Sequence, residues 1–185
     1  MLADCHCHLD LFDFPKQVIE MALNVNVGHV FSCSTDFLSM QKNVGFKDIK
    51  QVKIALGVHP VDLLKMPKAE VKKSLDFLAE NIHFADAVGE IGLDYKCAMT
   101  MKERALQENI FARQVQIAIE NNLPVVVHSR FAEKKTMEIL KKSGAKKVLM
   151  HWFTNSIESV SIALENGFFM SCGPVIFSSE KAAIV

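Results

Sequence analysis

Ala3-Asp4-Cys5-His6-Cys7-His8-Leu9-Asp10 opens the chain and places two histidines two positions apart. Side chains alternate between the faces of a strand, so His6 and His8 share one face with Asp4, and the two cysteines share the other. Two imidazoles on one face can fill two positions around a divalent metal ion. A buried strand with hydrogen-bonded histidines would carry the same residues. Further ligands at the ends of later strands would decide between these interpretations.

Composition narrows the class of protein. The 185 residues are half hydrophobic, which predicts one domain over residues 1–185 with one sizeable core. Twenty-one basic residues balance twenty-one acidic ones, so nucleic acid would have to bind at a local patch. The sequence has neither an apolar run of the ~20 residues that a membrane span needs nor a leader, which predicts a cytoplasmic protein without a membrane partner. The five cysteines lack C-x-x-C spacing and are interpreted as free thiols.

Apolar runs typical of strands alternate with helical patterns along the chain. Seven such runs occupy residues 2–8, 29–33, 52–58, 84–91, 124–128, 147–151 and 168–172. Helices are predicted at residues 15–24, 36–44, 102–122 and 157–166. One further helix is predicted to start at residue 67, and another to end at residue 143. Asp13 is the expected cap of the first helix, and Ser34, Thr35 and Asp36 are alternative caps for the second. Gly144 follows the end of a later helix, and residues 178–180 are expected to open another.

This alternation predicts a parallel sheet with helical crossovers, either doubly wound or a TIM-type (β/α) barrel. A Gly-x-Gly-x-x-Gly turn does not follow the first run, which weakens the dinucleotide-binding version of the doubly wound fold. Seven βα units are visible, and a barrel has eight. We therefore expect an incomplete, C-terminally truncated barrel whose eighth strand is missing from this chain.

Side chains of types that can bind metal ions stand at the ends of five of these runs. In a barrel, all strands end at the C-terminal face, which is where active sites lie. Glu90 is informative, because a carboxylate can bridge two cations whereas one imidazole nitrogen cannot. Four imidazoles with one bridging carboxylate suit two divalent ions about 3.5–4 Å apart, as in hydrolases of phosphodiesters. The ligand types admit zinc, manganese or magnesium. The residues at these ends are His6, His8, His59, Glu90, His128 and His151.

Five motifs in order resemble the TatD-type metal-dependent deoxyribonucleases, which belong to the amidohydrolase-like metal hydrolases. They are residues 4–10 (Asp-Cys-His-Cys-His-Leu-Asp), 57–60 (Gly-Val-His-Pro), 89–95 (Gly-Glu-Ile-Gly-Leu-Asp-Tyr), 128–130 (His-Ser-Arg) and 151–153 (His-Trp-Phe). The resemblance runs from residue 3 to about residue 178. It implies phosphodiester hydrolysis on DNA, often as a 3′-to-5′ exonuclease.

The resemblance also implies a ligand set. His6 and His8 match the ligands of one metal ion, Glu90 matches the carboxylate shared by both ions, and His128 and His151 match the ligands of the second. The family has a further ligand, an aspartate at the end of the eighth strand, and this chain ends before it. We therefore expect the metal ion on His6 and His8 to be bound more loosely than the other.

Substrate contacts follow from the resemblance in the same way. His59 matches a histidine near the scissile phosphate, and Arg130 matches a basic residue suited to pairing with a phosphate. With Glu90, these two are the expected catalytic residues. Asp94 and Tyr95 match a loop at the rim of the pocket. A strand-end hydrogen bond for His59 and a surface salt bridge for Arg130 are the structural alternatives.

Three smaller expectations concern the neighbours of these ligands. Trp152 could stack on a DNA base, although core packing explains it equally well. Asp4 either orients a ligand or caps the backbone. Cys5 and Cys7 are expected to face the helices. The family's usual pattern after the sixth strand is altered here to Trp-Phe-Thr-Asn at residues 152–155, which bears on substrate preference.

Other functions remain open at the level of sequence. A related barrel hydrolase could act on a small phosphoester, amide or lactone. A phosphoesterase of the polymerase-and-histidinol-phosphatase type also begins with His-x-His but normally needs more ligands. An inactive, truncated product is the non-enzymatic alternative.

Overall fold

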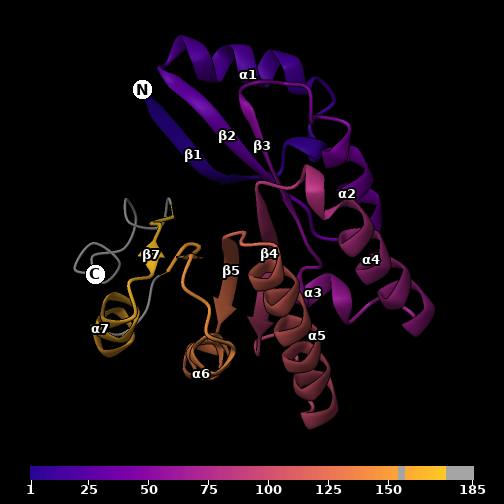
Figure 1. Cartoon of the computed structure of the whole chain (residues 1–185), viewed down its shortest axis with the longest axis vertical. Helices are drawn as coiled ribbons and strands as arrows, with labels where there is room; N and C mark the ends of the chain where they lie inside the picture. Colours follow the sequence, from indigo (N-terminus) through magenta and orange to yellow (C-terminus); the bar gives the residue numbers. More distant parts are fainter. Residues whose placement is uncertain (154–156, 174–185) are drawn as a thin grey trace.

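A computed structural model describes residues 1–153 and 157–173 of the chain. Seven strands form one parallel sheet in the order β1-β2-β3-β4-β5-β6-β7 (Figure 1). A doubly wound sheet would reverse its strand order at a switch point, so the strictly sequential order identifies the barrel-type architecture. The strands are β1 (Leu2–Cys7), β2 (Val27–Cys33), β3 (Val52–Leu56), β4 (Ala87–Asp94), β5 (Val125–Arg130), β6 (Val148–Met150) and β7 (Phe169–Met170).

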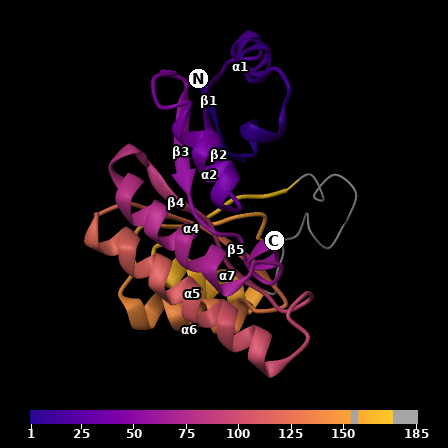
Figure 2. The same ribbon diagram turned by 90° about the vertical axis from the view of Figure 1, so that its right-hand side faces the viewer.

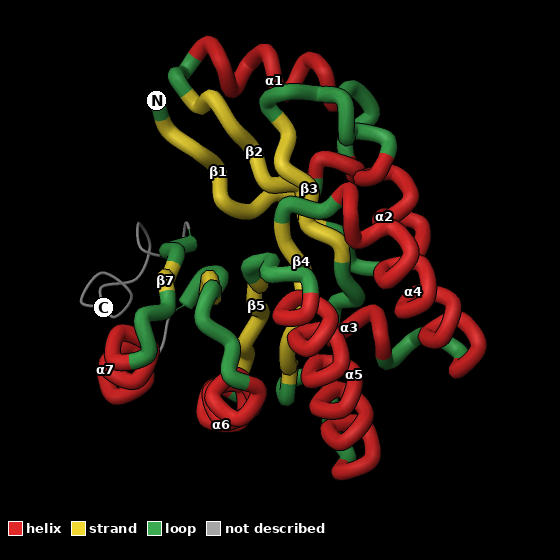
Figure 3. Tube along the Cα trace, viewed as in Figure 1, coloured by secondary structure: helices red, strands yellow, loops and turns green. Residues whose placement is uncertain are grey.

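The sheet curls into an arc, with helices along its outer side (Figures 1 and 3). Among the described residues, β1 and β7 do not pair with each other, so the arc is open between them. The helices are α1 (Pro15–Asn24), α2 (Phe37–Val44), α3 (Pro60–Leu63), α4 (Lys68–Asn81), α5 (Met101–Glu120), α6 (Glu133–Ser143) and α7 (Ile157–Glu165), with 3-10 turns η1 (Leu9–Leu11) and η2 (Ile82–Phe84).

Burial follows the position of each strand in the arc. All eight residues of β4 are buried, as expected for a central parallel strand covered on both faces. The first four residues of β1, at one edge, are exposed. Figure 2 shows α1 lying over this edge, apart from the layer formed by α4, α5 and α6. None of the helices in residues 1–153 and 157–173 is long and apolar enough to cross a membrane.

Local sequence signals explain most helix boundaries. Asp36 caps α2, since its carboxylate accepts a hydrogen bond from the Ser39 amide at 2.7 Å. Gly144 ends α6 with φ +76°, a conformation that glycine adopts at little cost. The expected cap at Asp13 was wrong. The residue before α1 is Phe14, whose side chain makes no capping bond.

Several other boundaries differ from the prediction. β4 continues to Asp94 rather than ending at Ile91, and β3 ends at Leu56 rather than at Val58. Helix α3 was not predicted, because its single turn is too short to show a period. β2 begins at Val27, two residues before the predicted start at His29. The helix predicted from Ser178 lies outside the described residues.

Strands β4 and β5 approach each other unusually closely at Gly92. This residue has φ +145°, and a Cβ atom there would lie 2.0 Å from the carbonyl oxygen of His128. Gly92 and His128 are Cα partners in the parallel ladder. A glycine is therefore required where β4 carries the polar residues of the site past the end of β5.

Candidate metal centre

The polar residues that follow the strands meet in one cavity of about 630 Å³. It contains all five predicted metal ligands together with His59, Arg130 and Trp152, but Asp94 and Tyr95 are not among its lining residues. The lining residues are His6, Cys7, His8, His59, Glu90, His128, Ser129, Arg130, His151 and Trp152.

Glu90 lies at the centre of the site, and only 3% of this residue is exposed. Its Oε2 atom is 3.2 Å from Nε2 of His6 and 3.6 Å from Nε2 of His8. Its Oε1 atom is 3.1 Å from Nδ1 of His128 and 3.7 Å from Nε2 of His59. The two oxygens thus each face a different pair of imidazoles, which is the arrangement expected of a carboxylate shared by two cations.

Burial and hydrogen bonding act in opposite directions on Glu90. Burial by itself would raise the pKa of this carboxyl group, but the hydrogen bonds from His128 and His6 outweigh it. The pKa of Glu90 therefore lies well below its usual range. The carboxylate is ionised at neutral pH, which is the form that binds a cation.

On one side of Glu90, the histidines of β1 meet the histidine that follows β6. His8 donates from Nδ1 to the carbonyl of Cys33 at 2.9 Å, which leaves the Nε2 lone pair facing the cavity. Nε2 of His6 lies 3.2 Å from Nε2 of His8, a spacing expected of two nitrogen ligands that share one cation. The His6 ring also stacks on His151, with their centroids 3.5 Å apart.

The donor atoms of His6, Glu90 and His151 lie within 4.8 Å of one another and could hold one cation. Burial, followed by the charge of His6, lowers the pKa of His151 to about 3, so this imidazole is neutral and carries a free lone pair. The structure thus groups His151 with His6, whereas the family resemblance implies that His151 shares its ion with His128. Which ion each histidine binds stays a prediction.

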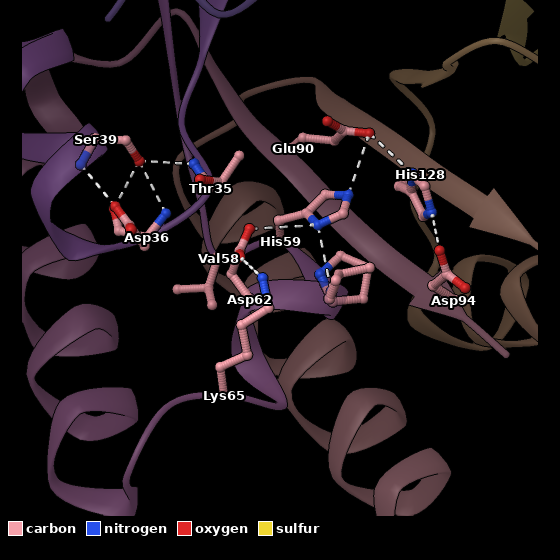
Figure 4. A network of polar contacts seen from close by, with 12 residues as sticks. Thr35, Asp36, Ser39, Val58, His59, Asp62, Lys65, Glu90, Asp94 and His128 are labelled. Atoms are coloured by element: carbon pink, nitrogen blue, oxygen red, sulfur yellow. Dashed lines mark hydrogen bonds and ion pairs between the residues drawn. The ribbon is translucent and has the colours of Figure 1, made fainter. Parts of the chain in front are cut away.

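On the other side of Glu90, His128 and His59 could hold a second cation with the same carboxylate. Figure 4 shows His128 between Glu90 and Asp94, whose Oδ2 lies 3.0 Å from Nε2 of His128. Burial would lower the pKa of His128, but the hydrogen bonds to Asp94 and Glu90 prevail and raise it to about 9 in the absence of an ion.

His59 differs from His128 in its hydrogen bonding. The Val61 amide donates to Nδ1 of His59 at 3.3 Å, so Nδ1 is an acceptor and Nε2 carries the proton. Burial is the main reason that the pKa of His59 falls to about 4, which makes its imidazole neutral at pH 7. A neutral ring with Nε2–H toward the cavity is a hydrogen-bond donor, a role closer to the predicted substrate contact than to a metal ligand.

Asp94 and Tyr95, predicted at the rim of the pocket, are placed elsewhere. The side chain of Asp94 is 1% exposed and faces His128. The hydroxyl of Tyr95 donates to Glu108 at 2.5 Å, and its ring packs under Arg104, so it faces α5. The prediction missed the contact between Asp94 and His128 because it ended β4 at Ile91. Strand alternation extended to residue 94 would have placed Asp94 on the face of Glu90.

The mouth of the cavity carries exposed side chains that could meet a substrate. Arg130 is exposed at the end of β5, and Trp152 is 55% exposed beside His151, with their rings 5.1 Å apart. Cys7 packs against the hydrophobic core and, like Ser129, is also among the residues that line the cavity. Asp4 accepts a hydrogen bond from the His6 amide at 3.0 Å, which is the backbone role considered above. Thr154 and Asn155 of the altered motif lie outside the described residues.

Comparison with known proteins gives matches over nearly the whole chain. The family model described as TatD related DNase matches residues 3–185. The human protein named deoxyribonuclease TATDN3 is 34% identical, over 100% of this chain and 72% of its own length. YabD of Bacillus subtilis, named an uncharacterized metal-dependent hydrolase, is 31% identical over 98% of this chain and 72% of its own.

Among solved structures, the TatD homologue YjjV from Escherichia coli superposes with a TM-score of 0.79 at 24% identity. The match covers 91% of this chain and 66% of that one, so this chain spans about two thirds of the length of YjjV. At this level of identity, the likeness supports the fold.

Proposed function

Since this chain belongs to the TatD-related DNase family, we propose that it is a metal-dependent hydrolase that cleaves DNA phosphodiester bonds with two divalent ions. The observation that carries the proposal is the buried carboxylate of Glu90, whose two oxygens face different pairs of imidazoles in one cavity. We further propose removal of nucleotides in the 3′-to-5′ direction, which rests on the family resemblance.

The donor set of the cavity fits two divalent ions. Imidazole nitrogens suit zinc and other transition metals, and the shared carboxylate also admits manganese or magnesium. When bound, the ions supply Lewis acidity at the phosphate and lower the pKa of water. The residues proposed to hold them are His6, His8, Glu90, His128 and His151.

The remaining cavity residues are proposed to bind and orient the substrate. The guanidinium of Arg130 can pair with two oxygens of a phosphate. His59 can donate from Nε2 to a phosphate or leaving-group oxygen, because the Val61 amide keeps the other ring nitrogen as an acceptor. The exposed ring of Trp152 can stack on a base, which fits a substrate with single-stranded character.

Glu90→Gln tests the proposal, because it keeps the shape of the side chain and removes its charge. We expect the variant to lose one or both metal ions in elemental analysis and at least about 100-fold of its activity on an end-labelled oligonucleotide. Labels at the 3′ and 5′ ends of separate substrates report the direction of cleavage. Glu108→Gln is the matched control, since Glu108 bonds to Tyr95 outside the cavity.

Two results would overturn the proposal. Wild-type metal content together with wild-type nuclease activity in Glu90→Gln would remove the metal centre from the mechanism. Hydrolysis of p-nitrophenyl phosphate or a small lactone, with no cleavage of DNA, would show that DNA is not the substrate. The proposal of a metal-dependent hydrolase would then still stand.

A further inference from the structure

We propose that Asp94 is a positioning residue that holds the His128 imidazole with Nδ1 toward Glu90, so that Nδ1 is the nitrogen through which His128 binds metal. This inference rests on the proposed function in one respect, the assignment of His128 as a metal ligand. It changes the role of Asp94 from a substrate contact at the pocket rim to a residue that acts through His128.

Both oxygens of the Asp94 carboxylate are engaged by the protein. Oδ2 lies 3.0 Å from Nε2 of His128, and Oδ1 accepts a hydrogen bond from the Cys97 amide at 3.1 Å (Figure 4 shows the former). The side chain is 1% exposed and does not line the cavity. Asp94 is therefore placed to hold the far side of the His128 ring rather than to meet substrate.

The contact with Asp94 fixes which ring nitrogen of His128 is available. A neutral imidazole has one N–H and one lone pair, and a carboxylate acceptor draws the N–H to its own side. Without a cation, both ring nitrogens carry protons, since Nε2 faces Asp94 and Nδ1 lies 3.1 Å from Oε1 of Glu90. When a cation takes the place of the Nδ1 proton between His128 and Glu90, the Nε2–H stays bonded to Asp94 and Nδ1 supplies the lone pair. A carboxylate behind a histidine in this way orients the ring and raises its basicity as a ligand.

His8 shows the same principle with the two nitrogens exchanged. Its Nδ1 donates to the Cys33 carbonyl at 2.9 Å, and its Nε2 faces Glu90. The two histidines therefore present opposite nitrogens to one carboxylate, each selected by an acceptor outside the cavity. Because His128 has a charged acceptor and His8 has a neutral one, removing the acceptor should affect His128 more strongly.

The backbone around Asp94 is fixed by a buried side chain of α5. Gln107 is 0% exposed, and its Oε1 accepts from the Asp94 amide at 3.0 Å, while its Nε2 donates to the Pro60 carbonyl at 3.0 Å. The close approach at Gly92 locks β4 against His128 two residues earlier. The position of Asp94 relative to the His128 ring is thus set by backbone contacts on both sides.

Metal affinity measured on two Asp94 variants tests the proposal without relying on catalysis. Protein freed of metal by a chelator is titrated with zinc in competition with a chromogenic chelator. For Asp94→Ala we expect about 10- to 100-fold weaker binding at one of two sites, with the other site within about twofold of wild type. Asp94→Asn keeps an oxygen acceptor toward His128 and should lose less affinity than Asp94→Ala.

Asp86→Asn is the matched control, because this carboxylate lies just before β4, at the other end of the strand, and bonds to the Ile54 amide and Lys53. It should leave both zinc affinities unchanged. Long-range ¹H–¹⁵N spectra of the imidazoles provide a second readout. The zinc-bound wild type should show His128 with its proton on Nε2, and Asp94→Ala should lose this signature.

The outcomes separate this inference from the proposed function. Wild-type zinc affinities at both sites in both variants, with His128 unchanged in the spectra, would overturn the role of Asp94 alone. An equal loss of zinc affinity at both sites in Asp94→Asn and in Asp86→Asn would also overturn the role of Asp94, since such a loss would indicate a general structural effect. Failure of the wild-type chain to bind zinc would overturn the metal centre itself, and absence of DNA cleavage by a zinc-binding protein would overturn only the substrate.

Discussion

At His59, one hydrogen bond and burial define the protonation state of the ring. The Val61 amide holds Nδ1 as an acceptor, and burial keeps the imidazole neutral by lowering its pKa to about 4. In the unfolded chain, a histidine has a pKa near 6.5. The unfolded state therefore takes up a proton between pH 6.5 and pH 4 that the folded state resists.

This difference predicts a pH dependence for the metal-free protein. The stability contributed by neutral His59 is present above pH 6.5 and is lost as the pH falls toward 4. Urea unfolding with a chelator present measures this effect. Between pH 7.5 and pH 4.5, the free energy of unfolding of the wild type should fall by about 2–3 kcal/mol more than that of His59→Asn. Equal losses in the two proteins would show that His59 titrates normally in the folded state.

The residues proposed as ligands could be located from the sequence because a strand in a parallel barrel carries its functional residues at one end. The cavity contains His6, His8, Glu90, His128 and His151, all expected from that rule. The partner of each imidazole was not predictable. The Cys33 carbonyl behind His8 and Asp94 behind His128 come from neighbouring strands whose register is set by packing.

Helix α5 shows what a hydrophobic period misses. Ile110, Phe111 and Ala118 are buried, but Leu106, which lies at helical spacing from them, is 39% exposed. Gln107 and Gln114 are buried instead, two turns apart on the inner face. Amides at these positions look like surface residues in a sequence, and only the neighbouring strand ends reveal them as hydrogen-bond partners.

Gln114 is predicted to stabilise the segment that carries His59. Its Oε1 accepts from the Val58 amide at 2.7 Å, and its Nε2 donates to the Val58 carbonyl at 3.2 Å. Gln114→Leu leaves both backbone groups buried and unpaired, so the free energy of unfolding should fall by about 2–4 kcal/mol. Urea denaturation of the metal-free protein measures this loss.

Gln116→Leu is the control for that measurement, since Gln116 lies on the exposed side of the same helix and bonds to Glu120. Its free energy of unfolding should stay within about 0.5 kcal/mol of wild type. Similar losses in both variants would mean that the effect comes from leucine on α5 and not from the bonds to Val58.

For the whole molecule, the proposed metal ligands join parts of the chain that are far apart in sequence. They come from β1, β4, β5 and the segments after β1 and β6. Because an unfolded chain cannot hold them together, zinc should stabilise the folded state by about 2.7 kcal/mol at 100 times its dissociation constant. For a chain of this size, a melting temperature about 5–10 °C higher than that of the chelated protein is expected.

Calorimetry with and without zinc checks this expectation, with Glu90→Gln as the variant that should respond least. An identical melting temperature for wild type in zinc and in chelator would contradict it. An equal rise in Glu90→Gln and in wild type would point to zinc bound elsewhere.

The alternation of strands and helices predicted parallel pairing but left a doubly wound sheet and a barrel open, and the sequential strand order of the structure identifies the barrel type. Strand ends were less predictable, because β4 continues through Gly92, a residue that usually interrupts a strand. The need for a glycine with φ +145° becomes apparent only when β5 is present, because a Cβ atom at this position would collide with the His128 carbonyl oxygen of β5. Features that depend on the distance between two strands leave little trace in either strand alone.

The stacked rings of His6 and His151 belong to strands that are not neighbours in the sheet, since β1 pairs with β2 and β6 pairs with β5 and β7. The two rings meet on the concave side of the curved sheet, so the 3.5 Å distance between their centroids depends on the curvature of the sheet. Flattening the sheet would draw the two rings apart. A cation bound by both histidines would cross-link the two strands and stabilise the curved sheet. By thermodynamic reciprocity, any partner that changes the curvature of the sheet would change the affinity for that cation.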